Sequence, residues 1–176
     1  MERRETDVKE TENRSTGKLS NPQNTIQVIQ KHGFAFQKKF GQNFLIDAHV
    51  LDKIIAAAGV TADDMVLEIG PGIGTMTQYL AERARQVTAV EIDTNLIPIL
   101  KETLSDYDNV TVINEDILKV DIKKLAEEYN GGKPIKVGGQ SAYYITTRLS
   151  WDCSRAEFPL TILRLWFRRK WRTGCR

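Results

Sequence analysis

The chain has 176 residues, a formal net charge of +2 and two cysteines. This length allows one domain with a sizeable core but is too short for two domains of ordinary size. Two cysteines exclude a disulfide framework and a cysteine-rich metal centre, and the N-terminal residues contain no apolar run of the kind found in signal peptides and membrane spans. We therefore expect a cytoplasmic protein that binds neither a membrane nor a metal.

The charge is distributed unevenly along the chain. Residues 148–176 carry a net charge of +6, all three tryptophans and both cysteines, which leaves −4 for residues 1–147. This basic, Trp- and Arg-rich tail differs in composition from the rest and is treated as a separate segment. Residues 1–20 are charged and poor in large apolar side chains, which predicts a disordered extension.

Basic and aromatic residues alternate shortly after this extension. A short amphipathic helix is expected before Gly33, and Lys38, Lys39 and Phe40 belong to the run that follows it. This mixture suits contact with the phosphates and bases of RNA. An ordinary cationic surface over buried phenylalanines would give the same pattern.

From residue 47 onward, helical and strand patterns alternate. Asp47 can cap a helix that extends to Gly59, because apolar residues recur between them at helical spacing. Strands are expected at 65–70, 86–93, 110–116 and 134–139, and the helices between them at 75–84, 94–104 and 121–129. Such alternation predicts an α/β fold with a parallel sheet and helices on both faces, within one domain at residues 21–147.

The turn after the first of these strands is rich in glycine. Gly70, Gly72 and Gly74 would let the backbone approach a ligand closely at the carboxyl edge of the sheet. The dinucleotide fingerprint needs its third glycine where Thr75 stands, which disfavours a dinucleotide oxidoreductase. The spacing resembles instead that of enzymes dependent on S-adenosylmethionine (SAM), although a plain tight turn remains the alternative.

Two carboxylates follow the next two strands. Glu91 ends the second strand, where its two oxygens can accept both hydroxyls of a ribose, and Asp116 ends the third, where it can accept from an adenine amine. Each could instead cap a helix or lie in solvent. Because the ends of parallel strands share one edge, the glycines and these acids together predict a SAM site. Methyl transfer from a sulfonium requires alignment of the reacting atoms and needs no metal.

Four stretches point to a known family. KKFGQNFLID (38–47), LEIGPGIGTMT (67–77), AVEID (89–93) and NEDIL (114–118) resemble the small-subunit ribosomal RNA adenine N6,N6-dimethyltransferases. The resemblance covers about residues 21–147 and implies a Rossmann-like SAM-dependent methyltransferase fold. It also implies that Asn43 and Leu45 line the cofactor, that Gly70 faces its methionine part, and that Glu91 and Asp116 hold its ribose and adenine. The implied substrate is 16S rRNA of the small ribosomal subunit, dimethylated at two adjacent adenosines during ribosome biogenesis.

The family carries N-L-P-Y or N-L-P-F after the fourth strand, and this chain departs from that motif. The aligned residues are Gln140, Ser141, Ala142 and Tyr143. Tyr143 keeps the aromatic ring that stacks a flipped-out base, whereas the amide of Gln140 lies one methylene further out than that of asparagine. Gln140 and Tyr143 are thus the candidate catalytic residues, and we expect impaired methyl transfer.

A frameshift would account for the altered motif. A possible coding sequence for residues 138–142, GGTGGCCAATCTGCC, gives V-A-N-L-P when it is translated one base later. Similar shifts of frame turn parts of residues 148–176 into apolar, helix-like sequence. We therefore expect a truncated chain that lacks the last strands of the sheet and the family's C-terminal helical domain. A basic RNA-binding arm and a membrane-surface helix are the competing interpretations of the tail.

Two other functions stay open on the sequence alone. The first is a non-catalytic RNA-binding protein that keeps the fold. The second is an adenine N6-methyltransferase acting on 23S rRNA.

Overall fold

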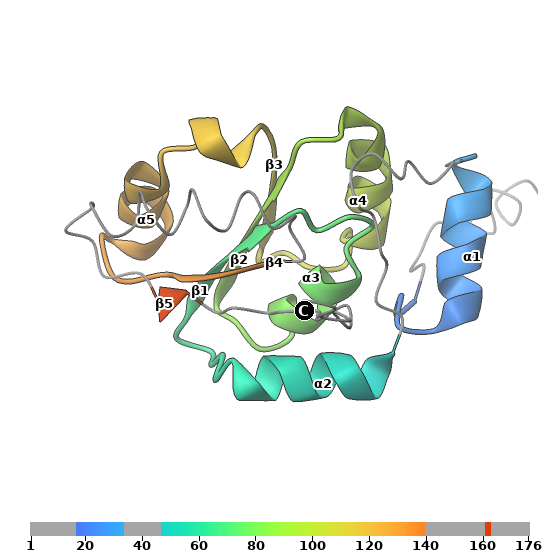
Figure 1. Ribbon diagram of the computed structural model, residues 1–176, viewed down its shortest axis with the longest axis horizontal. Helices are drawn as coiled ribbons and strands as arrows, with labels where there is room; N and C mark the ends of the chain where they lie inside the picture. Colours follow the sequence, from blue (N-terminus) through green and yellow to red (C-terminus); the bar gives the residue numbers. More distant parts are fainter. Residues whose placement is uncertain (1–16, 34–46, 140–160, 163–176) are drawn as a thin grey trace, which may run out of the picture.

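The computed structural model describes residues 17–33, 47–139 and 161–162 (Figure 1). Its helices are α1 (Pro22–Lys31), α2 (Ala48–Ala57), α3 (Thr75–Ala81), α4 (Ile97–Thr103) and α5 (Ile122–Asn130), with short 3-10 turns η3 (Thr94–Leu96) and η4 (Ile117–Lys119). Its strands are β1 (Met65–Ile69), β2 (Gln86–Glu91), β3 (Val110–Asn114), β4 (Lys136–Gly139) and β5 (Thr161–Ile162). Within residues 47–139 every predicted strand and helix is confirmed, with ends that differ by a few residues.

The strands form one parallel sheet in the order β3-β2-β1-β4-β5. Strands β2 and β3 lie on one side of β1, and β4 lies on the other. Parallel strands in this order are joined by helical crossover connections, as the sequence predicts, and the Rossmann-like fold is confirmed. Because all strands are parallel, the residues after β1, β2 and β3 lie at a common edge. Strand β5 pairs with β4, so two residues of the segment 148–176 belong to the sheet.

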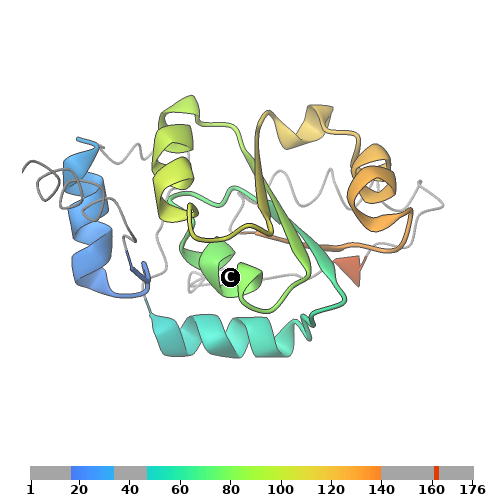
Figure 2. The ribbon, with the colours of Figure 1, turned by 180° about the vertical axis from the view of Figure 1, so that it is seen from behind.

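Helices cover both faces of the sheet (Figures 1 and 2). On one face, α2 and α3 pack against β1 and β2 through a buried cluster that includes Leu51, Ile55, Val66, Leu80 and Val87. On the other face, α5 packs through a cluster that includes Leu67, Val90, Leu125, Ala126 and Val137. Consecutive side chains of a strand point to opposite faces, so β1, whose five residues are all buried, contributes to both clusters, as expected for a strand in a parallel sheet covered on both sides.

Helix α2 begins where the sequence predicts. The Asp47 side chain accepts hydrogen bonds from the backbone N–H groups of His49 and Val50, at 2.9 and 3.2 Å. These bonds satisfy N–H groups that the first helical turn leaves unpaired.

The first described residues pack into the domain. Leu19 is fully buried, in a cluster with Val28 of α1, Leu96, and Ile99 and Leu100 of α4. Residues 17–20 thus belong to the folded domain, although the charge pattern predicts a disordered extension for them. A single leucine in a charged stretch has no periodicity, and most of its partners, such as Leu96 and Leu100, are distant in the chain, so no local pattern marks it as core.

None of the helices in the described segments has the length and apolar character needed to span a membrane.

Candidate functional site

The glycine-rich turn joins β1 to α3 in a backbone conformation that favours glycine. Gly70, Gly72 and Gly74 have φ values of 68°, 64° and 92°. The Gly70 N–H donates to the Val90 carbonyl at 2.9 Å, which ties the turn to β2. A Cβ atom built on Gly70 meets no described atom within 4 Å, so glycine is needed there for conformation, and no described atom blocks the side toward which Cβ would point.

Glu91 connects this turn to the end of β2. Its Oε2 accepts a hydrogen bond from the Gly72 N–H at 3.2 Å, and its Oε1 accepts one from the Asp93 N–H at 2.9 Å. The side chain is buried, and that burial raises the pKa of the Glu91 carboxyl. The backbone N–H of Ile92 also lies near enough to lower this pKa in part. A carboxylate has about four acceptor sites, so Glu91 keeps capacity to accept hydroxyl groups from a ligand.

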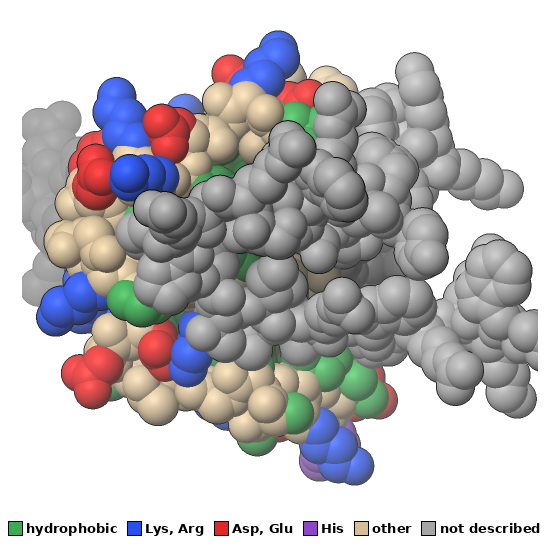
Figure 3. All heavy atoms as spheres, turned by 60° about the vertical axis from the view of Figure 1, so that its left-hand side comes forward, with side chains coloured by type: hydrophobic (Ala, Val, Ile, Leu, Met, Phe, Trp, Pro, Cys, Tyr) green, Lys and Arg blue, Asp and Glu red, His purple; other side chains and the backbone are tan. Residues whose placement is uncertain are grey.

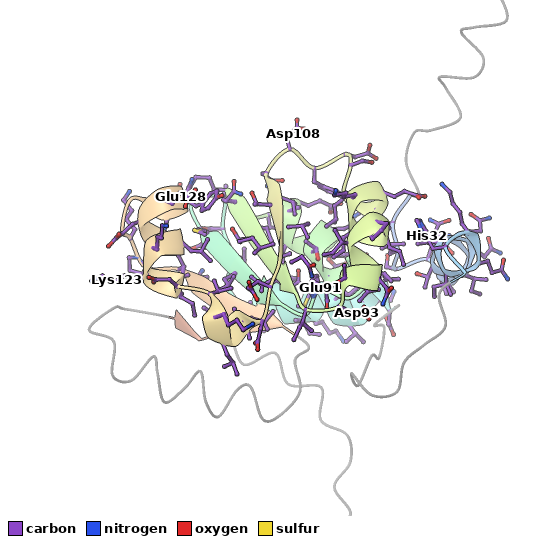
Figure 4. All side chains as sticks on the ribbon, turned by 90° about the horizontal axis from the view of Figure 1, so that it is seen from above. His32, Glu91, Asp93, Asp108, Lys123 and Glu128 are labelled. Atoms are coloured by element: carbon purple, nitrogen blue, oxygen red, sulfur yellow. The ribbon has the colours of Figure 1, made fainter. Side chains whose placement is uncertain are left out.

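The acids after β2 lie at one end of the strands. Figure 4 shows Glu91 and Asp93 together, at the opposite end of the sheet from Asp108, which precedes β3. The Asp93 side chain accepts from the backbone N–H of Asn95 at 3.0 Å and thereby starts η3. Its role in this structure is that of a helix cap, which fixes the chain just beyond Glu91.

Asp116 lies at the end of the neighbouring strand. The Glu115 N–H donates to the Glu91 carbonyl at 3.1 Å, which places the end of β3 beside the end of β2. Asp116 is partly buried and caps η4, because its Oδ1 accepts from the Leu118 N–H at 3.0 Å. The sequence left open whether Asp116 is a cap or a ligand-binding acid. The structure shows the cap, which is made through Oδ1.

Two exposed apolar residues at this edge were missed by the sequence analysis. Ile92 follows Glu91 and is 56% exposed, and Leu118 follows Asp116 by two positions and is 41% exposed. Among the described residues Ile26 is the only other large hydrophobic side chain with such exposure. Ile92 stands directly after a strand-terminal acid, but so does Ile117, which is 5% exposed, so exposure could not be judged without the fold.

A buried acid in β1, Glu68, was also not predicted from the sequence. It is 1% exposed, and burial raises the pKa of its carboxyl to about 7, with the nearby negative charge of Glu91 adding to the effect. The Thr77 hydroxyl is near enough to lower this pKa in part. Nevertheless, neither Thr77 Oγ1 nor Glu68 Oε2 has the geometry of a hydrogen bond to any described group.

The structure therefore brings together Gly70, Gly72, Gly74, Glu91 and Asp116 as predicted. The other predicted site residues lie outside the described residues, namely Lys38, Lys39, Phe40, Asn43, Leu45, Gln140 and Tyr143. In the described part of the chain, no three His, Cys, Asp or Glu side chains gather where they could hold a metal ion.

Comparison with known proteins gives the family. The model of the family described as "Ribosomal RNA adenine dimethylase" matches residues 33–171. The chain belongs to this family. The match includes the glycine-rich turn and both acids of the site, and it continues past residue 147 into the basic tail.

Curated relatives agree with this assignment. The ribosomal RNA small subunit methyltransferase A of Lachnoclostridium phytofermentans is 64% identical over 143 residues, which are 81% of this chain and 49% of that protein. The protein of the same name from Clostridioides difficile is 48% identical over 82% of this chain and 50% of its own length. The chain thus spans about half the length of the curated relatives it matches.

Two solved structures of RNA-modifying methyltransferases share the fold. The 23S rRNA methyltransferase ErmE is 38% identical, with a TM-score of 0.56 over 68% of this chain and 45% of that one. A dimethyladenosine transferase from Plasmodium falciparum is 28% identical, with a TM-score of 0.52 over 65% of this chain and 38% of that one.

The residues present fit the SAM cofactor that the family resemblance implies. The fit rests on the side of Gly70 that no described atom blocks and on the buried Glu91 carboxylate, whose two oxygens face separate backbone donors. Exposed Ile92 and Leu118 add apolar surface beside the two acids, which a planar base requires.

Proposed function

We propose that the chain carries the cofactor half of an rRNA adenine N6,N6-dimethyltransferase that acts on 16S rRNA in the small ribosomal subunit. The observation that carries this proposal is the Glu91 carboxylate, held by Gly72 and Asp93 at the edge where the glycine-rich turn ends. When bound, SAM supplies a methyl group on a positively charged sulfur. A cytoplasmic location follows from this substrate.

Each residue of the site has a distinct part in cofactor binding. Glu91 accepts the two ribose hydroxyls, and the turn at Gly70 lets the methionine part approach the backbone. Asp116 would accept a hydrogen bond from the adenine amine, and Ile92 and Leu118 would supply apolar surface to the adenine ring. The dimethyltransferase family resemblance adds Asn43 and Leu45 to this lining.

RNA contact is proposed for residues outside the described part of the chain. Lys38, Lys39 and Phe40 combine positive charge with an aromatic ring, and Tyr143 would stack the flipped-out adenine. On the face drawn in Figure 3, the described Lys and Arg side chains are interspersed with Asp and Glu. On this face the described charges do not form the single-sign patch that a phosphate-backbone site uses.

The cofactor proposal is tested by isothermal titration of S-adenosylhomocysteine into the chain and its variants. Glu91→Gln should weaken binding roughly 10- to 100-fold, because it removes a charged acceptor of two hydrogen bonds. Asp108→Asn is the matched control, since it makes the same chemical change at the opposite end of the sheet. Equal affinities for Glu91→Gln and the unmodified chain would contradict the proposed role of Glu91.

The altered motif gives a second test, of catalysis. We propose that the Gln140-Ser-Ala-Tyr sequence limits methyl transfer while cofactor binding persists. The triple change Gln140→Asn, Ser141→Leu, Ala142→Pro restores the family motif and should raise tritium transfer from labelled SAM to unmethylated 30S subunits. Full activity of the unmodified chain would refute the impairment.

A 23S rRNA target is the competing proposal, favoured by the likeness to ErmE. The same transfer assay with protein-free 23S rRNA separates the two, since labelling of 23S rRNA without labelling of 30S subunits would overturn the 16S assignment. A non-catalytic RNA-binding role predicts RNA affinity with a steep salt dependence that does not change when Glu91 is replaced.

A further inference from the structure

The glycine-rich turn is also held from behind, by a contact that involves none of the site's acids. The Thr103 hydroxyl, at the end of α4, donates to the Ile73 carbonyl at 2.9 Å. Thr103 is 3% exposed and Ile73 is fully buried. Ile73 stands between Gly72 and Gly74, so this bond fixes the middle of the turn relative to α4.

A buried amide in turn orients Thr103. Gln78 lies one helical turn after Gly74 in α3 and is 2% exposed. Its Nε2 donates to the Thr103 carbonyl at 2.9 Å, and its Oε1 accepts from the Leu19 N–H at 3.0 Å. Gln78 thus joins α3, α4 and the first described residues at one point.

The front of the turn is sensitive to small displacements. The Gly72 N–H reaches Glu91 Oε2 at 3.2 Å, the long end of the range for such hydrogen bonds. Movement of the turn away from β2 would lengthen this bond and loosen the Oε2 end of the carboxylate, while Asp93 still holds Oε1. The Thr103–Ile73 contact opposes that movement, because it holds the adjacent peptide group.

We propose that Thr103, oriented by Gln78, is a positioning residue that sets the distance between the glycine-rich turn and Glu91, and thereby the affinity for the cofactor. The inference rests on the proposed cofactor site. It assigns a role in ligand binding to two residues that do not touch the ligand.

The test uses the full chain and three substitutions. Thr103→Val removes the hydroxyl and keeps the side-chain shape, Thr103→Ser keeps the hydroxyl, and Asn109→Ala is the control. Asn109 Nδ2 donates to two backbone carbonyls near the end of α3, at 2.8 and 3.0 Å, so its loss lowers stability without touching the turn. Each variant is titrated with S-adenosylhomocysteine, and amide hydrogen exchange of residues 72–74 is measured without ligand.

Thr103→Val should weaken S-adenosylhomocysteine binding about fivefold, the worth of one neutral hydrogen bond, and speed amide exchange in the turn. Thr103→Ser should keep both the affinity and the exchange rate of the unmodified chain. Asn109→Ala should change neither the affinity nor the exchange rate, even if it lowers the unfolding temperature as much as Thr103→Val does. Unchanged affinity in Thr103→Val, or an equal loss in Asn109→Ala, would overturn the proposal. If the unmodified chain does not bind S-adenosylhomocysteine, the proposed function fails, and amide exchange in the turn alone tests the positioning role of Thr103. Faster exchange in Thr103→Val that is confined to residues 72–74 would then support this role. Unchanged exchange would overturn it.

Discussion

Replacing Glu68 by glutamine should remove a pH-dependent loss of stability from the chain. The Glu68 carboxyl is 1% exposed in β1, and burial raises its pKa from the ordinary 4.5 to about 7. An acid whose pKa is higher in the folded state binds more protons there than in the unfolded chain. Its contribution to stability is therefore fully present below pH 4.5 and is lost as the pH rises through about 7.

The size of this loss follows from the two pKa values. Each pKa unit of difference between the folded and unfolded states corresponds to about 1.4 kcal/mol. The rise from 4.5 to about 7 thus corresponds to roughly 3 kcal/mol of unfolding free energy lost between acidic and mildly basic pH. Glutamine has nearly the same shape and cannot ionise, so the variant should gain about this amount relative to the unmodified chain over that pH range.

The assay is urea unfolding followed by circular dichroism at several values between about pH 5 and pH 8.5. The difference in unfolding free energy between Glu68→Gln and the unmodified chain is plotted against pH. Because Glu91 is present in both chains, its own raised pKa largely cancels in this difference. Glu128→Gln, at an exposed position of α5, makes the same change as a control and should give a flat plot. A flat plot for Glu68→Gln as well would refute the argument from burial.

Three further predictions concern stability and are measured by the same unfolding assay. Leu19→Ala should cost about 2–5 kcal/mol because Leu19 is fully buried, whereas Ile26→Ala, at a 52% exposed site, should cost under about 1 kcal/mol; equal costs would contradict the packing of residues 17–20. Gly74→Ala should cost about 1–3 kcal/mol, because φ is +92° and the new Cβ would lie 3.2 Å from side-chain atoms of α4 and Leu104; an unchanged urea midpoint would count against this conformation. Asn109→Ala should cost about 1–3 kcal/mol through two lost hydrogen bonds, and a cost near zero would show that water replaces them.

Local patterns predicted the sheet and the core of the site. Strands such as 65–69 are short apolar runs that end at glycine, and the intervening helices have apolar residues at helical spacing, so each element is encoded within a few residues. The parallel order then places Gly70, Glu91 and Asp116 at one edge, because each follows its own strand. For these residues, position in the sequence was sufficient.

Pairing across the chain was not predictable in the same way. The bond from Leu19 to Gln78 joins residues 59 positions apart, and the bond from Thr103 to Ile73 joins residues 30 apart. No sequence pattern marks either pair, because the residue type alone does not show whether a side chain such as that of Gln78 is buried or exposed. The same holds for Glu68, which looks like an ordinary strand residue and is distinguished only by its burial.

The sequence by itself determined the elements, their order and the residues at the strand ends, because helical and strand periodicities and glycine turns are local properties of the chain. Only the tertiary structure decided which polar groups lie in the core, that Ile92 and Leu118 stay exposed beside the two acids, and that residues 17–20 support the turn. Burial depends on what the rest of the chain places against a residue. That is a property of the assembled fold, and it also sets the pKa of Glu68 and the geometry of Glu91.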